Sequence, residues 1–182
     1  MSKKPILIVA GEPFSVFSEI LFKTFKRHRI KNPLVVIASI NLFQKQMDFL
    51  KYKIPLNKIN KNFNFNDLKI NKINIIDIKL NFKKPFQEIS NSSNVYIKKS
   101  FELALSLMKT KIFTGLINGP ISKKHFLKNK FLGITEYLAQ KTKTKNFAML
   151  IYNKDLSVNP ITTHIPVRKI YKLITKDKIY NH

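Results

Sequence analysis

The chain has 182 residues, 44% of them hydrophobic and 12% aromatic, so it can bury a sizeable core and we do not expect global disorder. It contains no cysteine, which rules out disulfides, thiolate metal sites and a cysteine nucleophile. No stretch approaches the ~18 apolar residues of a membrane span, and the apolar run 6–10 is too short for a secretion signal. We therefore expect a soluble, cytoplasmic protein with no membrane partner.

The charge is strongly one-sided, with 34 lysines and arginines against 10 acidic residues and a formal net charge of +24. Such a balance normally suggests a nucleic-acid partner. However, only three of the basic residues are arginines, the side chain favoured for bidentate phosphate recognition. The lysines are scattered among many asparagines, isoleucines and phenylalanines, all residues with A/T-rich codons. We interpret the charge mainly as compositional drift and do not expect nucleic acid to bind. A basic, non-enzymatic nucleic-acid-binding module is the alternative.

Strands alternate with helices along the chain. Continuous apolar, β-branched runs predict buried strands, and amphipathic periodicity predicts helices. The predicted strands are 5–10, 34–38, 73–80 and 112–117, and the predicted helices are 18–29, 41–52 and 90–109. Residues 53–72 read as an exposed connection with room for a short strand. Helical patches at 121–129 and 135–142, a hairpin of strands 147–152 and 156–162, and a helix from Pro166 follow. This order predicts an α/β domain with a largely parallel sheet, which the hairpin would make mixed.

Four histidines are candidates for metal or acid–base chemistry. His28 lies at a basic helix end and is expected to be a solvated cap, His125 is expected to be exposed in a lysine-rich helix, and the terminal His182 is uninformative. His164 differs because it follows a predicted strand, and ligands bind at strand ends in open α/β sheets. A purely structural role for His164 is the alternative.

Several common catalytic motifs are missing. The four glycines fall in neither a dinucleotide-binding G-x-G-x-x-G nor a P-loop spacing, and there is no G-x-S-x-G nucleophile elbow. Carboxylates are scarce, and those nearest to turns and strand ends are Glu12, Glu19 and Glu136. Each could equally be a helix-terminus charge, which is the favoured interpretation for Glu19.

Three segments together resemble the 4-hydroxythreonine-4-phosphate dehydrogenase family of vitamin B6 biosynthesis. Gly11-Glu12-Pro13, followed by Glu19-Ile20, is similar to the family's opening Gly-Asp/Glu-Pro motif. The run 119–123, with 133–139 after it, resembles Pro-Ile/Leu-Asn/Ser-Lys followed by Gly-His-Thr-Glu. The run 162–168 resembles Thr-Thr-His-x-Pro-Leu-Arg/Lys. Their order and spacing also fit, and the match extends over essentially the whole chain.

The resemblance implies a fold, a reaction and a set of site residues. The fold would be an isocitrate/isopropylmalate-dehydrogenase-like mixed sheet flanked by helices, with residues 1–182 forming the N-terminal α/β part of a two-domain enzyme. The reaction would be NAD-dependent oxidation and decarboxylation of 4-phosphooxy-L-threonine to 3-amino-2-oxopropyl phosphate. His164 matches the first of three histidines that hold a divalent metal (zinc, magnesium or cobalt), and Thr135 matches a substrate-binding threonine. The family also implies a homodimer.

The departures from the family pattern matter as much. Ile134 occupies the position of a substrate-binding histidine and can neither donate nor accept a hydrogen bond. The residues 14–18 replace the glycines of the opening motif. Family chains continue beyond this end, into the part with the other two metal histidines, the phosphate-binding groups and most of the cofactor site. We therefore expect a truncated chain that is incompetent by itself. A non-catalytic relic that associates with a full-length relative is the alternative.

Overall fold

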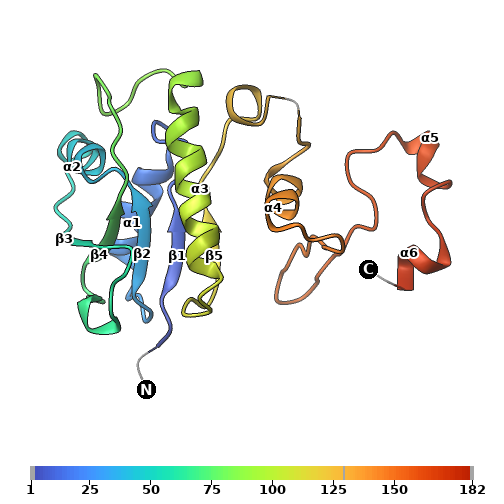
Figure 1. Cartoon of the computed structure of the whole chain (residues 1–182), viewed down its shortest axis with the longest axis horizontal. Coiled ribbons are helices and arrows are strands. Elements are labelled where there is room, and N and C mark those ends of the chain that lie inside the picture. Colours follow the sequence, from blue (N-terminus) through green and yellow to red (C-terminus); the bar gives the residue numbers. More distant parts are fainter. Residues whose placement is uncertain (1–2, 129, 181–182) are drawn as a thin grey trace. The chain divides into compact units, whose positions relative to one another are not determined.

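The computed structural model describes residues 3–128 and 130–180, so the sequence interpretation of His182 lies outside the described residues. The chain divides into two compact units, 1–126 and 127–182 (Figure 1). The first unit contains a five-stranded parallel sheet in the order β3-β4-β2-β1-β5. Its strands are β1 (Ile6–Val9), β2 (Leu34–Ala38), β3 (Leu56–Ile59), β4 (Ile73–Asp77) and β5 (Leu116–Asn118). The short strand β3 lies within the connection expected at 53–72.

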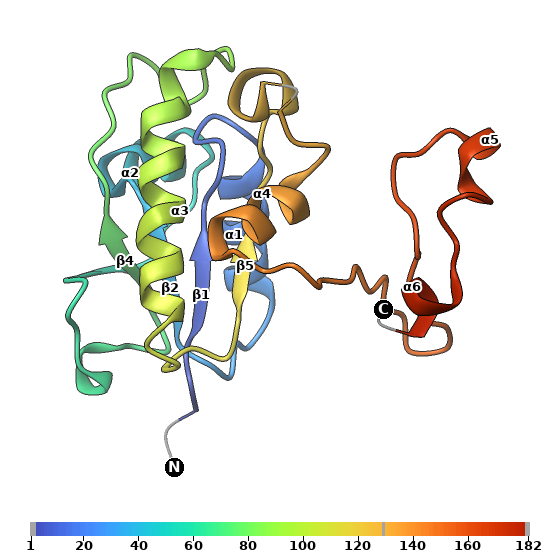
Figure 2. The same ribbon diagram turned by 45° about the vertical axis from the view of Figure 1, so that its right-hand side comes forward.

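Helices cover both faces of this sheet. The helices α1 (Phe17–Arg27) and α2 (Ile40–Phe49) pack on one face and α3 (Asn94–Met108) on the other (Figure 2). On the first face, Phe22 of α1 and Met47 of α2 join Ile8 and Val36 of the strands in one buried cluster. On the second face, Phe101 of α3 is fully buried. Coverage from both sides explains why the strands read as unbroken apolar runs rather than as alternating patterns.

The loops at the carboxyl ends of the strands hold the helix starts. Ser39 caps α2 by accepting a hydrogen bond from the Leu42 amide at 3.4 Å, and Asp77 at the end of β4 accepts one from the Ile40 amide at 3.0 Å. Two short 3-10 turns, η1 (Phe65–Asp67) and η2 (Asn91–Ser93), precede β4 and α3. A side chain at the end of β4 thus helps to fix the start of α2, the helix that follows the neighbouring strand β2.

The second unit contains short helices and little sheet. After the helical turn η3 (Lys123–Leu127) at the boundary come α4 (Ile134–Thr142), α5 (Val167–Ile170) and α6 (Lys176–Tyr180). The α/β prediction is confirmed, but the predicted hairpin is reduced to one antiparallel bridge, Ile151 to Val158, outside the sheet. The described sheet is consequently parallel, not mixed. A two-stranded hairpin is marginal without a third strand or a covering helix, and Tyr152 and Leu156 beside the bridge are exposed.

None of the helices in residues 3–128 and 130–180 is both long enough and apolar enough to span a bilayer.

Candidate functional site

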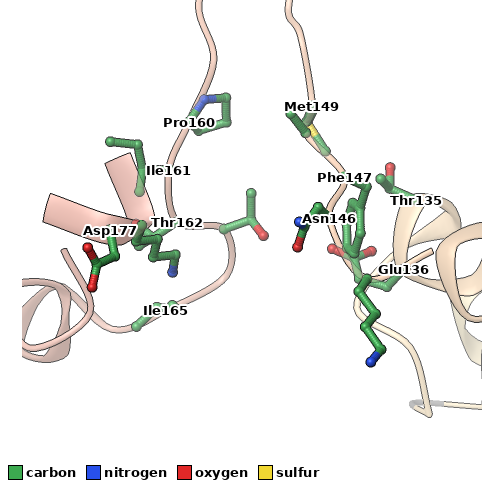
Figure 3. Close-up of a pocket in the computed structure, with 14 residues that line it drawn as sticks. Thr135, Glu136, Asn146, Phe147, Met149, Pro160, Ile161, Thr162, Ile165 and Asp177 are labelled. Atoms are coloured by element: carbon green, nitrogen blue, oxygen red, sulfur yellow. The ribbon is translucent and has the colours of Figure 1, made fainter. Parts of the chain in front are cut away.

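A cavity of about 680 Å³ lies within the second unit. Its walls come from the start of α4, the segment 145–149, the turn 160–165 and the start of α6. Figure 3 shows Thr135 and Glu136 on one side and Thr162 on the opposite side. The lining combines hydroxyl, amide and charged groups with apolar side chains, a mixture that suits a small polar ligand.

Thr135 and Ile134 begin helix α4 directly after Gly133. Thr135 lines the cavity, whereas Ile134 beside it is half-buried and is not among the lining residues. The N-terminal end of a helix carries unpaired amides and a partial positive charge, so it favours an anionic group. The Glu136 carboxylate, which also lines the cavity, adds a negative charge in the same turn.

His164 lies in a tight turn between cavity-lining residues. Its neighbours Thr163 and Ile165 line the cavity, while the His164 side chain is exposed and is not part of the lining. Its φ of 58° is in the left-handed region, which costs a residue with a Cβ about 1–2 kcal/mol. Among residues 3–128 and 130–180, the other non-glycine residues with positive φ are four lysines that lie one to three residues past the end of a helical segment: Lys51, Lys111, Lys128 and Lys143. His164 follows no helix, so its conformation belongs to the turn itself.

The residues present do not amount to a three-ligand metal site. No group of three or more His, Cys, Asp or Glu side chains that could hold a metal is found among residues 3–128 and 130–180. A catalytic zinc site of the usual kind needs three protein ligands, and His164 offers one. The described part of the chain therefore does not fit such a metal by itself.

The first unit brings two of the sequence motifs together at the carboxyl edge of the sheet. The Glu12 amide, after β1, donates to the Pro120 carbonyl at 2.7 Å, and the Gly119 amide, after β5, donates to the Val9 carbonyl at 2.7 Å. A Cβ on Gly11 would lie 2.4 Å from the Pro120 oxygen, and a Cβ on Gly119 would lie 2.2 Å from the Ala10 oxygen. The two turns approach so closely that only glycine fits at either position.

Glu12 is a buried carboxylate in this arrangement, with 2% of its surface exposed. Burial raises its pKa above the ordinary value, although the nearby Ser93 hydroxyl, the Phe14 amide and the His125 imidazole each lower it. Neither Ser93 nor Phe14 is close and aligned enough to complete a hydrogen bond with either carboxylate oxygen. The sequence singled out Glu12 by its position after a strand and marked Ser93 only as one possible cap of a helix, so their proximity was missed.

Three of the other candidates can be placed. His28 is exposed at the C-terminal cap of α1, as predicted. His125 is half-buried, which corrects the expected exposure, because η3 turns it toward the sheet edge and its amide donates to Ser122 Oγ at 3.1 Å. Glu19 pairs with Lys23 one helical turn later on α1. This exposed pair is the helix-surface interaction that the sequence favoured.

In parallel α/β domains, ligands bind at the carboxyl ends of the strands, the edge where these turns meet. A family model described as "Pyridoxal phosphate biosynthetic protein PdxA" matches residues 29–182, and the chain belongs to this family. A 4-hydroxythreonine-4-phosphate dehydrogenase of Sulfurihydrogenibium sp. (strain YO3AOP1) is 30% identical over 177 residues, covering 96% of this chain and 54% of the relative. The family resemblance seen in the sequence is thereby confirmed, and this relative is named as a dehydrogenase.

Further relatives agree in fold and differ in name. The crystal structure of 4-hydroxythreonine-4-phosphate dehydrogenase from Klebsiella pneumoniae superposes with a TM-score of 0.83 at 22% identity, covering 98% of this chain and 57% of that one. A protein of Oceanobacillus iheyensis named "Putative D-threonate 4-phosphate dehydrogenase" is 25% identical over 186 residues, covering 99% of this chain and 56% of the relative. The chain thus spans about half the length of the relatives that it matches.

Proposed function

We propose that the chain forms the N-terminal α/β part of an NAD-dependent 4-hydroxythreonine-4-phosphate dehydrogenase of pyridoxal phosphate biosynthesis. The single observation that carries the proposal is the meeting of Thr135 and the turn 162–165 at one cavity, in a chain that the family model matches over residues 29–182. The substrate would be a small phosphorylated amino acid, oxidised at a secondary alcohol, and the compartment the cytoplasm. Family membership outweighs the alternative of a basic nucleic-acid-binding module, which rests on net charge.

Thr135 and the start of α4 are the groups that we expect to contact the substrate. The Thr135 hydroxyl and the first amides of α4 are hydrogen-bond donors suited to a phosphate or carboxylate oxygen, and Lys145 and Lys178 also line the cavity. Ile134 offers no hydrogen bond at the position where the family has histidine. Restoring the imidazole should improve binding by about 1.5–3 kcal/mol, the usual value of a hydrogen bond to a charged group.

A divalent metal (zinc, magnesium or cobalt) and NAD would require groups from outside the described residues. We propose that His164 provides one metal ligand and that the other two come from a polypeptide corresponding to the remaining half of the relatives. Such a site would form in a homodimer of the completed enzyme. On this proposal residues 1–182 have no dehydrogenase activity by themselves.

A second substrate is favoured by one specific observation, the name of the Oceanobacillus iheyensis relative. D-Threonate 4-phosphate and 4-phosphooxy-L-threonine share the phosphate, the carboxylate and the alcohol to be oxidised, and they differ at the carbon that carries a hydroxyl or an amino group. Kinetics with both compounds separate the two.

The test is a chimera that joins residues 1–182 to the remaining part of the Sulfurihydrogenibium relative. With NAD, metal and either substrate, the chimera should form NADH, and residues 1–182 alone should not. His164→Ala should abolish the activity, His28→Ala, at an exposed helix end, should leave it unchanged, and Ile134→His should lower KM about 10–100-fold. NADH formation by the isolated chain would refute its incompetence, and a fully active His164→Ala chimera would refute the role of His164.

A further inference from the structure

The carboxyl ends of β1 and β5 form the switch point of the sheet. After β1 the chain turns to α1 on one face, and after β5 it turns to η3 on the other face, where Phe126 stacks on Phe101 of α3 at 6.1 Å between ring centroids. Connections that leave neighbouring strands in opposite directions open a crevice at the strand ends, and ligands of α/β proteins bind there. Glu12 lies in the turn that follows β1.

Glu12 is a buried carboxylate without a hydrogen-bond or ion-pair partner among the described residues. Its side chain is 2% exposed, and no described residue, including the amides at the start of α3, hydrogen-bonds either carboxylate oxygen. A buried carboxylate is normally paired, hydrogen-bonded or bound to a cation, because removing it from water costs several kcal/mol. Lysine side chains abound in this protein, yet none pairs with Glu12 within the described residues.

Two further polar atoms, both from the start of α3, are also buried without a hydrogen-bond partner among the described residues, namely Ser93 Oγ and Asn94 Oδ1. Ser93 and His125 are both close enough to Glu12 to influence its ionisation. Asn94 follows Ser93 in the chain, and its Nδ2 donates to the His125 carbonyl at 3.0 Å, which holds it next to these two residues. Asn94 and His125 are half-buried, so the cluster extends from the buried carboxylate to the surface.

The composition of this cluster selects the ligand. It offers one formal negative charge, a hydroxyl and an amide carbonyl, which are oxygen ligands for a hard cation. No group of three His, Cys, Asp or Glu side chains suited to a metal occurs in the described chain, so a tightly held divalent ion is not favoured. We propose that Glu12, Ser93 and Asn94 bind a small monovalent cation, namely potassium, sodium or ammonium. The site is independent of the proposed dehydrogenase function.

Thermal unfolding of residues 1–182 in matched salts tests the site. The buffers would contain about 0.15 M potassium, sodium, ammonium or N-methyl-D-glucamine chloride at about pH 8, so that ionic strength and chloride are constant for a protein of net charge +24. At least one small cation should raise the midpoint by about 3 °C over N-methyl-D-glucamine, with saturation as its concentration rises. The order of the three midpoints identifies the preferred ion.

Two variants and a control locate the effect. Glu12→Gln should remove the difference between cations, and Ser93→Ala, which keeps the carboxylate, should raise the half-saturating concentration several-fold. Glu19→Gln, at an exposed carboxylate paired with Lys23, should respond like the wild type. Equal wild-type midpoints in all four salts, or an unchanged cation response in Glu12→Gln, would overturn the proposal. In that case a proton, rather than a cation, neutralises Glu12.

Discussion

The contact between the turns after β1 and β5 predicts a large penalty for Gly11→Ala. Gly11 has a φ of 73°, a conformation that costs an alanine about 1–2 kcal/mol. The added Cβ would also lie 2.4 Å from the Pro120 oxygen, a backbone atom held by the Glu12 amide, so the turns must separate. Forced packing of this kind costs about 1–3 kcal/mol. Together the free energy of unfolding should fall by about 2–5 kcal/mol, a large part of the total for a domain.

Urea unfolding followed by far-UV circular dichroism measures this change. The matched control is Gly115→Ala, because a Cβ at Gly115 meets nothing within 4 Å and its backbone is not left-handed. The control should shift the free energy of unfolding by no more than about 0.5 kcal/mol. The reasoning would be refuted if Gly11→Ala were as stable as the wild type, or if both alanine variants lost the same stability.

Two further predictions concern buried polar groups of the first unit. Tyr96→Phe removes the hydroxyl that accepts the Ser39 amide at 3.1 Å, and it should cost about 1–2 kcal/mol in urea unfolding, whereas Tyr152→Phe at an exposed ring should be neutral. The pKa of the Glu12 carboxyl is higher in the folded chain than its ordinary value of 4.5. From about pH 4.5 upward the unfolded chain therefore loses the Glu12 proton before the folded chain does. The free energy of unfolding consequently falls as the pH rises toward the pKa of Glu12 in the folded chain. Glu12→Gln has no carboxyl to titrate, so in N-methyl-D-glucamine buffer its free energy of unfolding relative to the wild type should grow as the pH rises from about 4.5. The opposite trend would contradict a raised pKa of Glu12.

The alternation of strands and helices in the first unit was predictable because local and tertiary preferences agree there. The run 34–38 is apolar and β-branched, and it forms β2 with the predicted bounds. The helix expected at 18–29 appears at 17–27, with Glu19 in its first turn and basic residues in its last. In both segments, the apolar side chains that the sequence pattern assigns to the core are the ones that face it.

The sequence predictions that were wrong or incomplete share a physical cause, because each depends on contacts between residues that are distant in sequence. The segments 147–152 and 156–162 have strand-like composition, but the described chain offers them no third strand, and one bridge is all that forms. The half-burial of His125 and the proximity of Ser93 to Glu12 arise from where η3 and α3 pack, which no local pattern encodes. His164 was expected after a strand at 156–162, but only the bridge at Val158 forms there, and the left-handed backbone of His164 was not foreseen.

The position of β1 between β2 and β5 has a consequence for how the protein folds during synthesis. Leu7 pairs with Val35 of β2 on one side and with Leu116 of β5 on the other. During synthesis, β1 can therefore form its backbone hydrogen bonds with β2 early, but those with β5 only after residue 118 has been made. At about 5–20 residues per second, β5 leaves the ribosome roughly 4–16 s after β2. During that interval a nascent sheet of β1–β4 presents an unpaired apolar edge, the kind of surface that recruits other chains. Chaperone binding to nascent chains should accordingly peak before residue 118 emerges and decline once β5 has docked.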